Sequence, residues 1–115
     1  MLLFKPEHVG PILEGRKTET RRMWTKWRCN VGSIHLAKTR MLSPEHFARL
    51  RILARWEQRL GDITDEGARR EGYNSREEYL RKFAEINAKS LRKSSFITDP
   101  IERIPVKVIS FEVMR

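Results

Sequence analysis

One stretch decides the fold, and it reads Arg49-Leu50-Arg51-Ile52-Leu53-Ala54-Arg55-Trp56-Glu57. Apolar side chains occupy every second position from Leu50 to Trp56, and charged side chains occupy most of the positions between them. A period of two places alternate side chains on opposite faces of a β-strand, whereas an amphipathic helix needs a period of about 3.6 residues. Arg and Ala favour a helix locally, but the alternation is long, so we predict a strand over residues 49–57.

Three further strands are predicted on either side of this one, at residues 2–4, 31–38 and 106–113. Residues 31–38 alternate between polar and apolar side chains. Residues 106–113 are rich in β-branched side chains, which suit a pleated, half-buried surface. The sheet would therefore draw its strands from both ends and from the middle of the chain.

Proline and glycine predict the helical segments of the first half. Pro6 suits the first turn of a helix that Gly15 closes. Pro11 lies inside this helix and predicts a kink, or two short turns in place of one regular helix. The sequence Ser43-Pro44-Glu45 is typical of a helix start, with a capping serine and a proline in the first position.

Two helices are predicted in the second half of the chain. Thr64 caps a short helix that Gly72 closes, and Ser75 opens a capping box. Behind Ser75, an apolar stripe at helical spacing marks the best-defined helix of the chain, formed by Tyr79, Leu80, Phe83 and Ile86. A polar loop is predicted over residues 89–99, ahead of the last strand.

This order of elements has no regular alternation of strand and helix. It predicts an α+β fold, with a small β-barrel or mostly antiparallel sheet and flanking helices. The sequence shows no repeat, linker or low-complexity tract, so residues 1–115 are interpreted as a single domain.

The charge of the chain favours a polyanionic partner. There are 24 Lys and Arg residues against 15 Asp and Glu residues, a formal net charge of +9, and 16 of the 24 cations are Arg. Arginine binds phosphate as a planar fork and stacks on bases, so this composition favours nucleic acid over a membrane surface. The alternative is a soluble, Arg-rich protein adapted to heat.

Several classes of protein are excluded by composition. A single cysteine, Cys29, cannot form an internal disulfide framework or a multi-cysteine zinc site, and the three histidines show no i, i+4 spacing. We therefore expect no metal and no cofactor. The first four residues are too short an apolar run for a signal peptide, and no uncharged run is long enough for a membrane helix. A cytoplasmic, reducing location is expected, while the oligomeric state stays open.

The most unusual stretch is residues 15–28, which contain six basic residues, one acid, three threonines and two tryptophans. Arg and Lys neutralise phosphates, Thr donates to oxygens, and Trp offers a flat face for an unpaired base. The residues predicted to bind nucleic acid are Gly15, Arg16, Arg21, Arg22, Trp24 and Lys26. In the alternative interpretation, Trp24 and Trp27 are core residues and the charges form a solvated rim.

Four of these positions, Gly15, Lys17, Thr20 and Arg22, reproduce the G-x-K-x-x-T-x-R signature of the ASCH family, whose fold is similar to the PUA domains of RNA-modifying proteins. The resemblance extends to a second block, residues 60–73, which contains Glu71-Gly72-Tyr73, and to a closing strand that ends at residues 111–113. It covers nearly the whole chain. Trp24, Lys26, Trp27 and Arg28 are outside what the signature requires.

The resemblance implies a barrel-like fold with flanking helices, a cleft beside the signature loop, and RNA or a modified nucleoside as partner. Some bacterial members of similar size are amidohydrolases that remove the acetyl group from acetylcytidine. The lysine and threonine of the signature and a glutamate of the second block act in their catalysis. In this sequence the corresponding residues are Lys17, Thr20 and Glu71.

The chemistry of this trio is consistent with amide hydrolysis, which needs a nucleophile, a proton carrier and a partner for the oxyanion. Thr20 could attack, Lys17 could act as its base, and Glu71 could protonate the leaving amine. Positions 17 and 20 would point to opposite faces of a regular strand, so the motif must cross a turn or a bulge.

Simpler roles are open for the same residues. Glu71 could pair with Arg69 or Arg70, and Thr20 could hydrogen-bond a turn. Tyr73 and Tyr79 are expected in the core or at its rim. The leading prediction is a domain that binds RNA or a nucleoside, followed by an amidohydrolase. A non-catalytic protein-interaction module is the third, and its partner would bind the strip formed by Arg49, Arg51 and Arg55.

Overall fold

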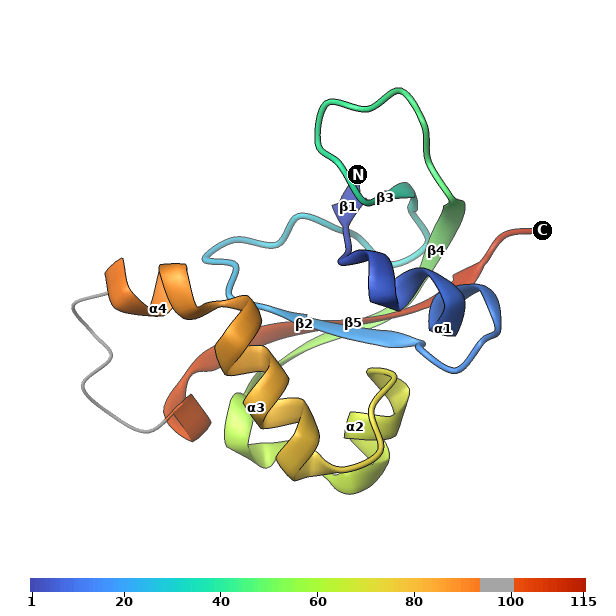
Figure 1. Ribbon diagram of the computed structural model, residues 1–115. Coiled ribbons are helices and arrows are strands. Elements are labelled where there is room, and N and C mark those ends of the chain that lie inside the picture. Colours follow the sequence, from blue (N-terminus) through green and yellow to red (C-terminus); the bar gives the residue numbers. More distant parts are fainter. Residues whose placement is uncertain (94–100) are drawn as a thin grey trace.

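A computed structural model of the protein describes residues 1–93 and 101–115, and its centre is one five-stranded sheet (Figure 1). The strands are β1 (Leu2–Leu3), β2 (Glu19–Arg22), β3 (Ile34–Lys38), β4 (Ala48–Arg59) and β5 (Pro105–Val113), in the spatial order β1-β3-β4-β5-β2. Only the pair β1 and β3 is parallel among these neighbours. The expected α+β fold with a mostly antiparallel sheet is therefore confirmed.

The helical elements flank the sheet. They are η1 (Pro6–His8), α1 (Val9–Leu13), η2 (Leu60–Asp62), α2 (Asp65–Arg70), α3 (Arg76–Ile86), α4 (Ala88–Lys93) and η3 (Ile101–Arg103). Figure 1 shows α2 and α3 together on one side of β2 and β5, with β1 and β3 on the other side. None of the helices in the described ranges has the length and apolar character that crossing a membrane requires.

The strand that decides the fold has the predicted alternation. Leu50 and Ile52 of β4 are buried, while Arg49, Arg51 and Leu53 between and beside them are exposed. The pairing of β4 with β5 shifts between Ile52 and Ala54, which marks a β-bulge. Because β4 pairs with β3 on one side and β5 on the other, it holds the two halves of the sheet together.

Local signals predicted the helix boundaries well. Pro11 lies in α1 after the separate turn η1, so the helix is split into two short pieces as expected. Thr64 accepts a hydrogen bond from the Gly67 amide, and Ser75 accepts one from the Glu78 amide, so both predicted caps are confirmed.

Two predicted elements are wrong. Residues 43–47 form a loop, because the Ser43 hydroxyl accepts from the amide of Glu45 two residues on, and the Phe47 amide already donates to Ala37 in the sheet ladder. The predicted polar loop at residues 89–99 begins instead as the helix α4, where Leu91 packs against the core. The rest of that loop, residues 94–99, lies outside the described residues.

Two hydrophobic clusters form the core. The first joins the sheet to α1 and includes Leu2, Phe4, Ile12, Leu50, Ile52 and Phe111. The second joins α2 and α3 to the C-terminal end of β4 and the start of β5. It includes Leu60, Ala68, Tyr79, Leu80, Phe83 and Val108. Trp56, expected in the core, packs against the second cluster, and Ile86 at the end of the predicted stripe is exposed.

Candidate active site

The signature loop places Lys17 ahead of β2. Gly15 adopts a φ of +79°, a conformation that suits glycine, and it ends the helical segment. The amides of Arg16 and Lys17 then both donate to the carbonyl of Pro11, at 2.9 and 3.0 Å. Because β2 begins at Glu19, Lys17 lies in this turn rather than in the strand, and both Lys17 and Thr20 line the same cavity. The motif thus crosses a turn, as its chemistry requires.

Glu71 reaches the same cavity from the end of α2. The Lys17 ammonium donates to Oε1 of Glu71 at 2.7 Å and to the Glu71 backbone carbonyl at 2.9 Å. The two side chains are 1% and 4% exposed, so this ion pair is buried. The next residue, Gly72, turns the chain at a φ of +96°, and a Cβ there would lie 3.5 Å from Cβ of Lys17.

Arg21 connects the ion pair to the sheet. Its Nη1 donates to Oε2 of Glu71 at 3.1 Å and lies 3.1 Å from Oε1 of Glu19, while its Nε donates to Gln58. Two cations, Lys17 and Arg21, thus oppose two carboxylates, and the buried cluster is neutral overall. A neutral cluster avoids the unpaired buried charge that would otherwise destabilise the fold.

Arg22 holds the threonine of the signature. Its Nε donates to Oγ1 of Thr20 at 3.0 Å, and its Nη2 donates to the carbonyl of Leu3 at 2.6 Å. The guanidinium carbon also lies 4.9 Å from the centre of the Phe4 ring. Because the arginine supplies the proton in its bond to Thr20, the hydroxyl proton of Thr20 stays free to be donated elsewhere.

The cavity itself has a volume of about 280 Å³ and forms where the two core clusters meet. Phe4 comes from the first cluster, and Tyr79 and Phe83 come from the second. The remaining wall includes His8, whose Nε2 is hydrogen-bonded to the Tyr73 hydroxyl at 2.8 Å. The site therefore combines a buried polar cluster with an aromatic wall.

The pocket shifts the titration of its own side chains. Burial lowers the pKa of Lys17, and the Glu71 carboxylate opposes that shift. Burial and the charges of Lys17 and Arg22 lower the pKa of His8 to about 4, so this imidazole is neutral at pH 7. Burial and the Glu71 charge raise the pKa of Tyr73 to about 12 and that of Tyr79 well above 10, so both phenols keep their protons.

The three residues of the implied catalytic trio all line this cavity. Glu71 does not pair with Arg69 or Arg70, which was the simpler alternative. Arg70 instead contacts Glu66 and lies 3.7 Å from Glu19. Their catalytic roles stay predictions.

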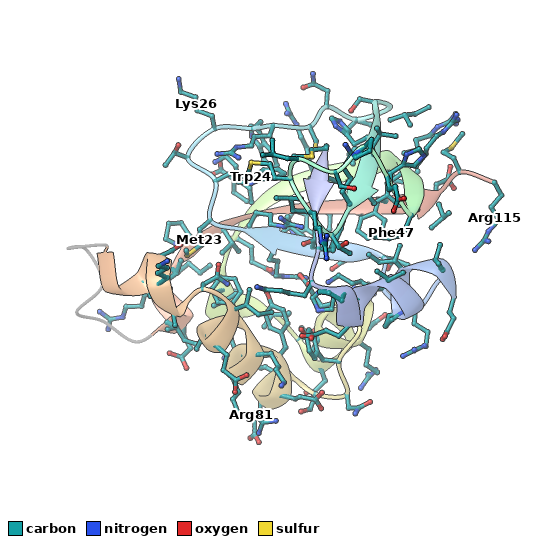
Figure 2. The ribbon with its side chains drawn as sticks, turned by 45° about the horizontal axis from the view of Figure 1, so that its top comes forward. Met23, Trp24, Lys26, Phe47, Arg81 and Arg115 are labelled. Carbon is teal, nitrogen blue, oxygen red and sulfur yellow. The ribbon has the colours of Figure 1, made fainter. Side chains whose placement is uncertain are left out.

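The six residues predicted to bind nucleic acid fall into two groups. Arg21 and Arg22 line the cavity and have the partners given above, whereas Gly15, Arg16, Trp24 and Lys26 lie outside it. Arg16 pairs with Glu14 at the surface, at 2.8 Å. Figure 2 shows Trp24 and Lys26 on the loop that follows β2, with the Lys26 side chain pointing away from the body of the protein. Their nucleic-acid contacts also stay predictions.

Sequence reasoning missed part of the wall. No pattern placed His8 at a site, and Tyr73 and Tyr79 were interpreted as core or rim residues. The one available signal was Tyr73, which directly follows Glu71-Gly72 in the second block of the resemblance. Cys29 is buried, and burial raises the pKa of its thiol, as for a cysteine that packs in the core. Across residues 1–93 and 101–115 no group of three or more His, Cys, Asp or Glu side chains is placed to hold a metal ion.

Comparison with known proteins supports the fold. No family model matches the sequence, and no curated protein matches it significantly. Among solved structures, the ASCH domain from Lactobacillus crispatus JV V101 superposes with a TM-score of 0.72 at 12% identity, covering 91% of this chain and 69% of that one.

Two further structures superpose with a TM-score of 0.67 at 14% identity. Protein EF3133 from Enterococcus faecalis V583, of family DUF984, is matched over 94% of this chain and 70% of its own. The hypothetical protein PH0355 is matched over 98% of this chain and 96% of its own. Together with the mixed sheet and flanking helices, these matches show that the chain has the α+β, PUA-like fold of an ASCH domain.

Proposed function

We propose that the protein binds a single nucleoside in the Lys17/Glu71 cavity and hydrolyses an acyl amide on its base, with acetylcytidine as the type of substrate. The observation that carries the proposal is the buried ion pair of Lys17 and Glu71, 2.7 Å apart, in a cavity that Thr20 also lines. A buried ion pair beside a hydroxyl in a pocket is typical of catalytic sites.

The size of the cavity and the pairing of its two most buried cations favour a small ligand over a nucleic-acid strand. A volume of about 280 Å³ is at the lower end of the range for small-molecule pockets. Lys17 and Arg21 are already neutralised by buried carboxylates, so they are poorly suited to replace the counterions of phosphates. A flat base against the aromatic wall fits both the size and the apolar surface.

The proposed reaction has two steps. The reaction starts from the form in which Lys17 has released its proton to solvent, a form that burial favours and the Glu71 carboxylate opposes. Oγ of Thr20 attacks the amide carbonyl carbon, and its proton passes to the neutral Nζ of Lys17. As the carbon–nitrogen bond breaks, the exocyclic nitrogen of the base takes a proton from the Lys17/Glu71 pair. Water then hydrolyses the acyl ester on Thr20, which releases the carboxylic acid and restores the hydroxyl. Arg22, bonded to Oγ1, stabilises the charge that develops on this oxygen.

The test is release of cytidine from acetylcytidine, followed by chromatography. We expect Thr20→Val and Glu71→Gln to lower turnover by about 10²–10⁴-fold, the usual contribution of such groups. Arg16→Ala is the matched control, because this exposed cation lies in the same loop outside the cavity. Absence of turnover at several temperatures would reject acetylcytidine as substrate, and an active Thr20→Val variant would reject the nucleophile.

A second candidate function, RNA binding, is supported by the loop after β2. Trp24 is partly exposed with the Arg28 guanidinium 5.7 Å from its ring centre, and Lys26 is exposed. Filter binding of single-stranded and structured RNA tests this function, because phosphate contacts make the affinity fall with salt. Binding that ignores salt, or that persists in the double variant Lys26→Ala and Arg28→Ala, would argue against it.

A further inference from the structure

The Tyr79 hydroxyl lacks a partner in the described part of the chain. Tyr79 lies on α3, is 3% exposed, and lines the cavity. Its hydroxyl is buried, yet it makes no hydrogen bond with residues 1–93 or 101–115. Buried polar groups are almost always paired, so this one calls for a physical reason.

Packing does not supply that reason. The Tyr79 ring contacts the Tyr73 ring at 5.7 Å between centres and the Phe83 ring at 6.0 Å. A phenylalanine at this position would make the same ring contacts without burying an unpaired oxygen, and it would therefore suit the core better. A group that is unfavourable for folding but lines a pocket is a candidate for ligand contact.

The surroundings of the hydroxyl indicate what it can contact. Glu71, Arg21 and Arg22 line the same cavity, and the charges of these three groups act on the pKa of the Tyr79 phenol. It keeps its proton at neutral pH and can donate. Neighbouring polar groups are already occupied, since His8 is bonded to Tyr73 and the Asn87 amide donates to the Phe83 carbonyl.

We propose that Tyr79 is a specificity-determining residue whose hydroxyl donates a hydrogen bond to the ring carbonyl oxygen of a pyrimidine in the cavity. This inference rests on the proposed function, because it takes the ligand to be an acylated cytidine. The phenol keeps its proton among charges of both signs, those of Glu71, Arg21 and Arg22, and a neutral donor of this kind suits an uncharged carbonyl oxygen. Bases without an acceptor at that position would leave the hydroxyl unpaired and would bind more weakly.

The experiment compares Tyr79→Phe with the unchanged protein on two ligands. One is acetylcytidine, and the other is a neutral C-nucleoside analogue, 2-acetamido-5-ribosylpyridine, in which carbon replaces the ring nitrogen bonded to ribose and C–H replaces the ring carbonyl. We expect Tyr79→Phe to weaken binding of acetylcytidine by about tenfold, the usual loss for one neutral hydrogen bond, and to leave binding of the analogue unchanged. Calorimetry gives both dissociation constants when both proteins also have Thr20→Val, so that acetylcytidine is not consumed. A thermal melt of Tyr79→Phe without ligand is expected to show an equal or higher Tm.

Each other outcome is decisive. Equal binding of acetylcytidine by both proteins, an equal loss for both ligands, or a clearly lower Tm of the ligand-free variant would overturn the role of Tyr79. Binding with the expected pattern but without hydrolysis would overturn the proposed reaction and leave this inference standing. Failure of the unchanged protein to bind acetylcytidine would overturn both.

Discussion

Replacing Glu71 with glutamine removes the charge that neutralises the buried cluster. Glutamine keeps the size of the side chain and one acceptor oxygen, so the change is mainly electrostatic. Lys17 and Arg21 would then face Glu19 alone, and the Lys17 ammonium, 1% exposed, would have no carboxylate within hydrogen-bond distance. Removing one partner of a buried ion pair destabilises proteins by about 3–5 kcal/mol.

The size of the effect on melting follows from chain length. The unfolding entropy of globular proteins is about 2.1 cal/mol/K per residue, which gives roughly 0.24 kcal/mol/K for 115 residues. A loss of about 3–5 kcal/mol therefore lowers Tm by roughly 12–20 °C. The control is Glu66→Gln, because Glu66 is exposed and pairs with Arg70 across one turn of the same helix, where a surface ion pair contributes less than about 1 kcal/mol.

The destabilisation of Glu71→Gln is expected to depend on pH. Without the Glu71 charge, nothing offsets the burial that lowers the pKa of Lys17. The unfolded state then binds more protons than the folded state below the ordinary lysine pKa, so the stability of the variant rises with pH up to about 10. Urea unfolding followed by tryptophan fluorescence at pH 6 and pH 9 measures this. A variant that is no less stable than Glu66→Gln at pH 6 would refute the electrostatic reasoning.

Three further predictions concern other parts of the structure. The pKa of His8 in the folded protein, about 4, is below its value in the unfolded chain. The contribution of His8 to stability is therefore complete above about pH 6.5 and declines as the pH falls towards 4. An NMR titration of the ring tests this, and a measured pKa near 6.5 would contradict it. Gly61→Ala would place a Cβ 2.6 Å from Cβ of Glu102, so we expect a loss of about 1–3 kcal/mol in urea unfolding, and no loss would show that η3 moves freely. Arg55 lies 4.6 Å from the ring centre of Trp27, so Arg55→Ala is expected to change the tryptophan emission and to lower stability by about 1 kcal/mol, whereas an unchanged spectrum would contradict the contact.

The elements predicted correctly are those whose determinants are local. The period of two across residues 49–57 predicted the strand correctly because one face of β4 is buried up to Ile52 and half-buried beyond it, while the other face is exposed. The caps at Thr64 and Ser75 are satisfied within three residues, so the sequence alone contains both partners. Ser43 has the same local signal, but the Phe47 amide donates to the Ala37 carbonyl and keeps this segment beside the sheet. A pattern of a few residues around Ser43 does not contain this long-range contact.

The side-chain contacts in the candidate active site could not be predicted from local sequence signals. The sequence offered Arg69 and Arg70 beside Glu71, and the actual partner is Lys17, 54 residues away. The turn at Gly15 and the backbone hydrogen bond from Lys17 to Pro11 make this contact possible. The spacing of residues along the sequence does not give the distance between the Lys17 and Glu71 side chains or the directions in which they point. The signature and the second block pointed to the candidate residues, while the pairing among them depends on where the end of α2 lies relative to the turn before β2.

The cations of residues 16–28 differ in burial and pairing, and this difference limits what the two proposed sites can bind. Residues 16–28 have six cations, and the structure encloses two of them, Lys17 and Arg21, with two carboxylates. Arg22 and Lys5 also line the cavity, so it keeps some positive charge, but its two most buried cations are paired and an uncharged base would be held mainly by shape and hydrogen bonding. Lys26 and Arg28 are exposed, where long-range attraction to a polyanion operates. Salt should therefore weaken RNA binding at the loop strongly and nucleoside binding in the cavity little, and a common salt dependence would mean that both ligands use one site.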